Sequence, residues 1–475
     1  FFQAEDGIRD HCVTGVQTCA LPISEQYTLN ARFLLQARMA TLARMGCVVF
    51  HYDMVGYADS KDYIHGMGFT DVGAVLNGQS FMGLQTWNTI RALDFLSSLP
   101  DVDPRRIGVS GASGGGTQTF ILCAIDERPA VAFPAVMVST GMQGGCVCEN
   151  CPNLRVGTGN VEFAALFAPR PLGMSGADDW TREIESKGLP ELQALYSLYR
   201  LPDNVLAKAY LQFGHNYNQV SRELMYAWMN RHLRLNVADL QERPIDPIPV
   251  KQLSVFDEKH PKPSDAKKPA ELRIYLTETA QSTWNSLRPT DARSRRRFVE
   301  TVGPALQAML VDRLPDADAV EVRDVGPVEC GGYAVDRLLL GRREPKTLLP
   351  AESFPAVVFH PRQWSGRMAV WTHAGGHQAL VDAGQKSPIP PLQRLLDRGF
   401  AVLAPDVFLT GEFHSGDKPT PAPEIDKVYS GYSLGFNRSV LANRVHDLLT
   451  ARSEEHTSEL QSHSDLVCRL LLEKK

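Results

Sequence analysis

The stretch Arg-Ile-Gly-Val-Ser-Gly-Ala-Ser-Gly-Gly-Gly-Thr-Gln-Thr (Arg106–Thr119) joins a short apolar run to a helical pattern. Its centre, Gly111–Gly115, is a Gly-x-Ser-x-Gly pentapeptide. A strand before it and a helix after it are typical of a sharp turn that strains a serine and exposes its hydroxyl. We therefore predict that Ser113 is a nucleophile. The N–H of Gly114, at the start of the helix, is expected to face a developing oxyanion.

A serine hydroxyl is a weak nucleophile at neutral pH, so a base and an orienting acid are needed. Two later predicted strands end in candidate residues: one leads to Asp178 and Asp179, and the next leads to His215. Sites in open α/β sheets form at the carboxyl ends of strands, which is where these residues lie. We expect His215 to take the proton of Ser113 while a carboxylate orients the imidazole ring.

Between about Glu25 and Leu235 the pattern alternates between strands and helices. The predicted strands are Cys47–Tyr52, Arg106–Ser110, Ala130–Val138, Pro171–Ser175 and Val205–Gln212. The predicted helices are Ala31–Met45, Gly83–Leu99 and Thr117–Ile125. Because each strand is apolar throughout, the pattern indicates an α/β fold with a mostly parallel sheet covered by helices on both faces.

Four motifs in this region resemble those of bacterial hydrolases called acetyl-xylan-esterase-like. They are Gly111–Thr119, Ala168–Leu172, Asp179–Thr181 and His215–Asn218. The resemblance covers residues 25–235 well and the later part of the chain more loosely. It implies an α/β-hydrolase fold, an acyl-enzyme mechanism, acylated carbohydrate as substrate and no cofactor. In that family the acid precedes Trp-Thr, which maps onto Asp179 and leaves Asp178 as the alternative.

Glycine-rich turns between a strand and a helix also occur in nucleotide-binding sites and in other hydrolases. A dinucleotide site is disfavoured because Gly-x-Gly-x-x-Gly is absent and the next strand ends at Val138–Ser139 without an acid. A phosphate-binding loop is excluded because no Gly-Lys-Ser/Thr follows. A serine peptidase or amidase of the same fold uses the same chemistry and remains an alternative. A non-catalytic relic is disfavoured because the three triad residue types occur in the expected order.

A second pentapeptide of the same pattern, Gly431–Gly435, reads Gly-Tyr-Ser-Leu-Gly. No apolar strand precedes it, so we expect no catalytic role for Ser433.

The composition and net charge argue against some classes of binding partner. The formal net charge of -5 gives no basic surface for nucleic acid. The longest apolar stretch, Ala130–Val138, is too short to span a bilayer. We expect a small-molecule or oligosaccharide ester as partner, no nucleic acid and no membrane span. Compartment and oligomeric state stay open, with secretion or a periplasmic location among the options.

The two ends of the chain, residues 1–24 and 452–475, resemble the translation of short-read sequencing adapters. They are therefore treated as adapter-derived and left out of the fold prediction.

An internal repeat indicates tandem hydrolase-type domains: Leu42–Asp53 matches Leu395–Asp406, and Gly83–Asp94 matches Gly435–His446. We expect an α/β-hydrolase domain that lacks its first strands, a linker with a helical connection, and the N-terminal half of a second such domain. Their ranges are residues 25–235, 236–320 and 321–451.

The first copy would lack the loop that supplies the second oxyanion donor. The second copy has such a loop at His373–Gly376 but ends before any elbow. We therefore expect little activity from the chain as written.

Cys146, Cys148 and Cys151 form a Cys-x-Cys-x-x-Cys pattern in a glycine-rich loop. A zinc site usually needs four ligands, and no fourth cysteine or histidine stands at a familiar spacing. We expect a structural loop and no metal.

Overall fold

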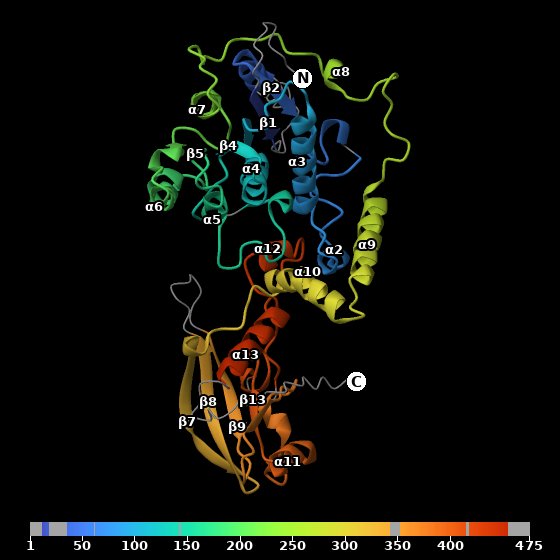
Figure 1. Cartoon of the computed structure of the whole chain (residues 1–475), viewed down its shortest axis with the longest axis vertical. Coiled ribbons are helices and arrows are strands. Elements are labelled where there is room, and N and C mark those ends of the chain that lie inside the picture. The colour runs from blue at the N-terminus through green and yellow to red at the C-terminus, as the bar shows by residue number, and fades with distance from the viewer. Residues whose placement is uncertain are drawn as a thin grey trace. The chain divides into compact units, whose positions relative to one another are not determined.

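The computed structural model describes residues 12–18, 36–60, 62–141, 144–342, 352–414 and 418–454. The chain divides into two compact units, each with its own sheet (Figure 1). Unit 1 comprises residues 1–284 and 426–435, and unit 2 comprises residues 285–425 and 436–475.

The sheet of unit 1 has six strands in the order β2-β1-β3-β4-β5-β6, and every pair is parallel. The strands are β1 (Cys12–Thr18), β2 (Cys47–His51), β3 (Ile107–Ala112), β4 (Pro129–Ala135), β5 (Leu172–Ala177) and β6 (Val205–Tyr210). Every residue of β3 and β5 is buried. A strand covered on both faces has no solvent-exposed side, so its sequence is an unbroken run of apolar or small residues.

Helices cover both faces of this sheet. The helix over residues 36–44 and α7 (Gln219–His232) share one apolar cluster with Phe133 of β4. The neighbouring residue, Ala132, belongs to a different cluster, as expected when successive side chains of a strand point to opposite faces.

That other cluster includes residues of α4 (Gly114–Ile125), α5 (Asn160–Ala165) and α6 (Leu189–Leu198). Helix α3 (Phe81–Ser98) packs beside α4 (Figure 1). This arrangement of a parallel sheet between two helix layers confirms the predicted α/β-hydrolase fold.

The strand β1 comes from residues that the sequence analysis excluded as adapter-derived. It pairs with β2 on one side and with β3 on the other, from Val13 opposite Ile107 to Thr18 opposite Ala112. Two buried strands with a gap between them would leave rows of unpaired N–H and C=O groups, which is costly. With β1 in that position, β2 and β3 both have a hydrogen-bonding partner for the backbone groups that face it. This unit therefore has one more strand than we expected from residues 25–235.

Helix starts differ from the predictions by a few residues, for local reasons. Helix α3 begins at Phe81, before the predicted Gly83, because the Ser80 side chain accepts a hydrogen bond from the Gly83 N–H at 3.0 Å. Helix α4 begins at Gly114, not at Thr117, since the turn at Ser113 passes directly into the helix.

Unit 2 holds a five-stranded mixed sheet in the order β10-β13-β9-β8-β7, of which only β10 and β13 are parallel. Its strands are β7 (Val320–Cys330), β8 (Tyr333–Arg342), β9 (Ser353–Phe359), β10 (Arg367–Val370) and β13 (Phe400–Pro405). A small pair, β11 (Val381–Asp382) and β12 (Ser387–Pro388), and the helices α11 (Pro390–Asp397) and α13 (Val440–Glu454) complete the main elements of this unit.

The stretch expected to connect the domains carries three helices. They are α8 (Val250–Leu253), α9 (Pro269–Ser286) and α10 (Ala292–Leu310). Helix α9 packs near α2 (Val72–Leu76), where Arg273 donates to Asp71 at 2.9 Å. No helix in the described part of the chain is both long and apolar enough to cross a membrane.

Residues 426–435, which include the short helix α12 (Gly431–Leu434), return from the second half of the chain to unit 1. Tyr429 is buried there and donates from its hydroxyl to the Asn150 carbonyl at 3.1 Å. The Asn153 N–H donates to the Leu434 carbonyl at 2.8 Å.

Candidate active site

Ser113 lies in a strained turn between β3 and α4. Its backbone has φ 56° and ψ −125°, and a positive φ is costly for a residue with a Cβ. Two backbone bonds hold it: the Ser113 N–H donates to Ala135 at 3.1 Å, and its carbonyl accepts from Thr117 at 3.0 Å. The strand-to-helix turn inferred from the pentapeptide is therefore present.

The glycines after Ser113 serve two different purposes. A Cβ on Gly116 would lie 2.7 Å from Met137 Cβ and 3.0 Å from the Ala135 carbonyl, so only glycine lets α4 approach this closely. Gly114 is the first residue of α4. The first N–H groups of a helix have no partner within it, which suits the Gly114 N–H to an anionic oxygen beside Ser113.

Asp179 and His215 come together from the ends of β5 and β6. His215 Nδ1 lies 2.6 Å from Asp179 Oδ2. The other oxygen of Asp179 accepts from the N–H of Thr181 at 2.7 Å and from its hydroxyl at 2.5 Å. The His215 and Asp179 side chains are only 14% and 6% exposed. The carboxylate is thus fixed on both oxygens, and it in turn fixes the imidazole ring.

The surroundings of Asp179 favour its ionised form. Burial raises the pKa of this carboxyl, but hydrogen bonds from His215 and Thr181 outweigh burial and leave the pKa below its ordinary value. Asp179 is therefore ionised at neutral pH and can accept the hydrogen bond that orients the His215 ring.

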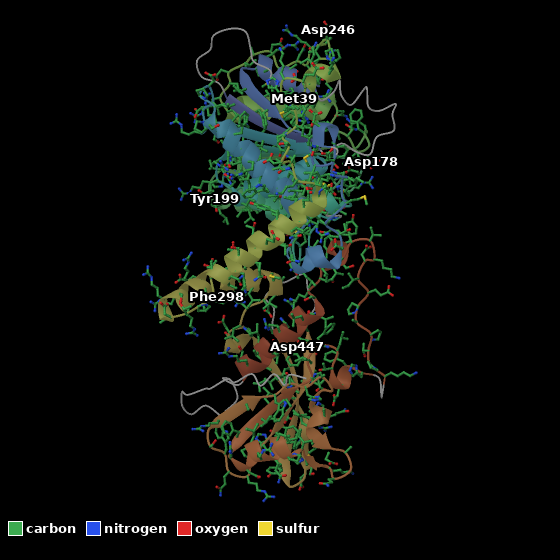
Figure 2. The ribbon with its side chains drawn as sticks, turned by 90° about the vertical axis from the view of Figure 1, so that its right-hand side faces the viewer. Met39, Asp178, Tyr199, Asp246, Phe298 and Asp447 are labelled. Atoms are coloured by element: carbon green, nitrogen blue, oxygen red, sulfur yellow. The ribbon has the colours of Figure 1, made fainter. Side chains whose placement is uncertain are left out.

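Asp178, the alternative acid, points elsewhere. Its side chain is 49% exposed at the surface of unit 1 and pairs with Arg182 (Figure 2). Its backbone N–H donates to the Phe213 carbonyl at 2.8 Å and so ties the loop after β5 to the loop after β6. Of the two adjacent carboxylates, only Asp179 reaches His215.

His215 Nε2 is buried and has no hydrogen-bond partner among the described residues. It therefore does not bond to Ser113 Oγ in this structure. Catalytic hydrogen bonds are often long without substrate and shorten in the substrate complex. A buried nitrogen that lacks a partner, on a ring whose other nitrogen is fixed, is suited to accept a proton.

Trp180 and Thr181 complete the support for His215, and residue-type reasoning did not assign them a role. The Trp180 ring packs on the imidazole with the ring centroids 4.4 Å apart, and the Trp180 carbonyl accepts from the Ser139 hydroxyl at 2.5 Å. The only sequence signal for them is their place in the Asp-Trp-Thr motif.

The second pentapeptide has a different structure. Ser433 lies within α12, and its hydroxyl accepts a hydrogen bond from the Asp426 N–H at 2.8 Å.

The loops expected to supply a second oxyanion donor can be placed only in part. In unit 1 the loop after β1 lies outside the described residues. In unit 2, the His373–Gly376 loop folds on itself: the Gly375 N–H donates to His373 Nδ1 and the Gly376 N–H to the His373 carbonyl, each at 3.0 Å.

The cysteine loop has a partner that the sequence analysis missed. Cys146 Sγ lies 3.6 Å from Nε2 of His65, and His65, Cys146 and Cys148 have their ligand-type atoms within 4.8 Å of one another. Cys151, the third cysteine of the pattern, is outside this group. His65 is 81 residues away from Cys146, so no local spacing could reveal the contact.

Comparison with known proteins gives partial matches. No family model matches the chain. A stretch of 167 residues, 33% of this chain, is 28% identical to the hydrolase YtaP of Bacillus subtilis (strain 168). That stretch spans 55% of YtaP, so the chain matches about half the length of this curated relative.

Among solved structures, the methylesterase BT1017 has 28% sequence identity and a TM-score of 0.49, over 60% of this chain and 63% of that chain. The acetyl xylan esterase of Paenibacillus sp. R4 has 18% identity and a TM-score of 0.33, over 48% of this chain and 77% of that chain.

Proposed function

We propose that unit 1 carries the active site of a serine carboxylic-ester hydrolase, with Ser113 as nucleophile, His215 as base and Asp179 as orienting acid. The observation that carries the proposal is the 2.6 Å contact between His215 Nδ1 and Asp179 Oδ2. This contact joins residues from the ends of two strands. The second nitrogen of the His215 ring is buried and has no hydrogen-bond partner within the described part of the chain. The strained turn at Ser113 supports it, because such strain persists where it serves a function.

In the acylation step, Ser113 Oγ attacks the ester carbonyl carbon while His215 Nε2 takes the serine proton. The carbonyl oxygen becomes an anion, and the Gly114 N–H stabilises it. When the tetrahedral intermediate collapses, the alcohol leaves with the proton from His215, and an acyl-serine remains. Asp179 holds the ring and stabilises its positive charge but does not itself take the proton.

In the deacylation step, water replaces the alcohol. His215 takes a proton from the water, the hydroxide attacks the acyl carbon, and the Ser113 oxygen leaves with the proton from His215. The products are a carboxylic acid and the free enzyme. No metal or cofactor is needed to balance either step.

We further propose that the ester is an acetyl group on a carbohydrate. This substrate class depends on the resemblance of the four motifs to acetyl-xylan-esterase-like hydrolases, since a fold by itself does not specify a substrate.

A fluorophosphonate probe tests the nucleophile directly on the full chain, because it labels an activated serine even where turnover is low, as expected if the second oxyanion donor is missing. We expect one label per chain, located on Ser113 by peptide mass spectrometry, with loss of the label in Ser113→Ala and its retention in Ser433→Ala. A chain that takes no label, or takes it equally in Ser113→Ala, would overturn the proposal.

Substrate assays separate the finer claims. Hydrolysis of p-nitrophenyl acetate together with acetate release from acetylated xylan would support both the esterase activity and the carbohydrate substrate. Hydrolysis of the aryl ester alone would keep the esterase and reject the carbohydrate. Cleavage of peptides in preference to esters would reject the esterase in favour of a peptidase.

A further inference from the structure

A second cluster of reactive side chains lies in unit 1 between two loops. His65 belongs to the loop after β2, whereas Cys146 and Cys148 belong to the loop after β4. Their Nε2 and two Sγ atoms all lie within 4.8 Å of one another. Both loops follow the carboxyl ends of parallel strands, so the fold brings them to one edge of the sheet although they are far apart in sequence.

The hydrogen bonding of His65 selects the form of the ring that binds metals. Its Nδ1 lies 2.8 Å from the Val55 carbonyl, which can only accept, so Nδ1 carries the proton. The lone pair is then on Nε2, the atom that lies 3.6 Å from Cys146 Sγ. A ligating histidine typically donates its other N–H to a carbonyl or carboxylate, and this fixes both tautomer and ring orientation.

The cysteine loop is held rigidly by its own backbone contacts. The Cys148 N–H donates to Cys146 Sγ at 3.4 Å. Glu149 accepts from the N–H groups of Gly145 and Cys146 at 2.9 and 3.0 Å, so this carboxylate is engaged in capping the turn.

Buried Arg155 adds to this order, because it donates to the Glu149 carbonyl and to the Asn150 side chain, each at 3.0 Å. The two thiols are thus positioned before any ligand arrives.

The walls of the cluster are apolar. Cys148 packs in a buried cluster with Val55, Phe81 and Val147, and the Phe81 ring meets the His65 ring edge-on at 5.0 Å between centroids. Apolar surroundings lower the local dielectric and so strengthen the binding of a small cation to anionic sulfur.

We propose that His65, Cys146 and Cys148 bind one Zn²⁺ ion. Zinc–sulfur bonds of about 2.3 Å and zinc–nitrogen bonds of about 2.0–2.1 Å at a tetrahedral angle place sulfur and nitrogen about 3.6 Å apart. The separation of Cys146 Sγ and His65 Nε2 is 3.6 Å. Both cysteines would bind the ion as thiolates, and the two negative charges balance that of the ion.

The fourth position of the tetrahedron takes water or a small anion. Glu149 is occupied by the backbone, and Cys151 packs with a different apolar cluster. The ion would cross-link the loop after β2 to the loop after β4. This proposal does not depend on the proposed esterase activity.

The test is zinc stoichiometry on the full chain, purified under reducing conditions, stripped with a chelator and re-loaded. We expect one zinc per chain that survives competition from a micromolar-affinity chelator dye. Loading with Co²⁺ is expected to produce thiolate-to-metal charge-transfer absorption. This reports on the unaltered chain and so does not depend on the folding of any variant.

Variants then assign the ligands. Cys146→Ser, Cys148→Ser and His65→Ala should each weaken zinc binding by at least about tenfold. Cys151→Ser is the matched control from the same loop and should bind as the parent does. The proposal is overturned if the reduced chain binds no zinc, if Cys151→Ser loses it equally, or if peptide mapping finds a Cys146–Cys148 disulfide that withstands reduction.

Discussion

Gly111–Gly115 and Gly431–Gly435 match the same five-residue pattern, yet their structures have little in common. Ser113 follows a fully buried strand and has φ 56° and ψ −125°. Ser433 lies inside the four-residue helix α12, with no strand directly before it among residues 419–430. The pattern allows a strained turn, but a strand that ends at the sheet edge and a long helix that starts there are needed to produce one.

The neighbours of the two serines differ for the same reason. The carboxyl edge of the sheet also carries the ends of β5 and β6, and so the Asp179–His215 pair is held at the edge where Ser113 lies. The Ser433 hydroxyl instead accepts a hydrogen bond from the Asp426 N–H, seven residues earlier in the chain.

Replacing each serine by alanine should produce the largest difference in activity between the two pentapeptides. Ser113→Ala removes the nucleophile, and kcat for p-nitrophenyl acetate should fall by roughly 10³- to 10⁶-fold. Ser433→Ala should change kcat by less than about twofold, because its hydroxyl accepts a hydrogen bond within a local turn, from the Asp426 N–H. Equal losses in the two variants would show that the context of the pattern does not matter.

The adjacent acids provide the next comparison. Asp179→Asn removes the charge that orients His215, and kcat should fall by roughly 10²- to 10⁴-fold. Asp178→Asn breaks only an exposed pair with Arg182 and should cost less than about threefold. A larger loss in the Asp178 variant would reverse the assignment of the acid.

Glycine replacements test the packing under the turn. Gly116→Ala places a Cβ 2.7 Å from Met137 Cβ and should lower the free energy of unfolding by about 1–3 kcal/mol. A Cβ at Gly141 would meet, among the described residues, the Ser139 hydroxyl at 4.0 Å, so Gly141→Ala should change the free energy of unfolding by less than about 0.5 kcal/mol. Urea unfolding followed by circular dichroism measures both, and equal stabilities would argue against close packing of α4.

The smallest expected effect is a pH dependence of stability. The pKa of Asp179 is lower in the folded chain than its ordinary value. Its ionised form therefore contributes stability that is complete above the unfolded-state pKa of about 3.9 and is lost as the pH falls through the folded value. The stability difference between the parent and Asp179→Asn should thus be constant near neutral pH and shrink below about pH 4. A difference that grows on acidification would contradict the hydrogen-bonding pattern.

The internal repeat shows the same dependence on context. In both copies a helix ends at a glycine in the left-handed region, Gly46 with φ 87° and Gly399 with φ 82°, and a strand follows. The sequence-based expectation that unit 2 is the N-terminal half of a second hydrolase domain stays a prediction.

The aspartates after these strands differ between the copies. Asp53 accepts from the Asp59 N–H, and burial raises its pKa. Asp406 is fully buried, yet hydrogen bonds from His377 and the Glu412 N–H outweigh burial and lower its pKa. The loop after β10 supplies His377, whose contacts with Asp406 have no counterpart among the contacts given above for Asp53.

The fold class and the turn at Ser113 could be predicted from the amino-acid sequence, because apolar runs, helical periodicity and small residues at a turn are patterns of neighbouring positions along the chain. The sequence also narrowed the acid to two neighbours at one strand end. The family resemblance already favoured Asp179 over Asp178. The tertiary structure adds that Asp179 contacts His215 whereas Asp178 pairs with Arg182, because a one-residue step in a loop reverses the direction of a side chain.

Only the tertiary structure, likewise, brought His65 to Cys146 and the Trp180 ring onto His215. Sequence spacing carries no information about contacts that exist because two separate loops end at the same edge of a sheet.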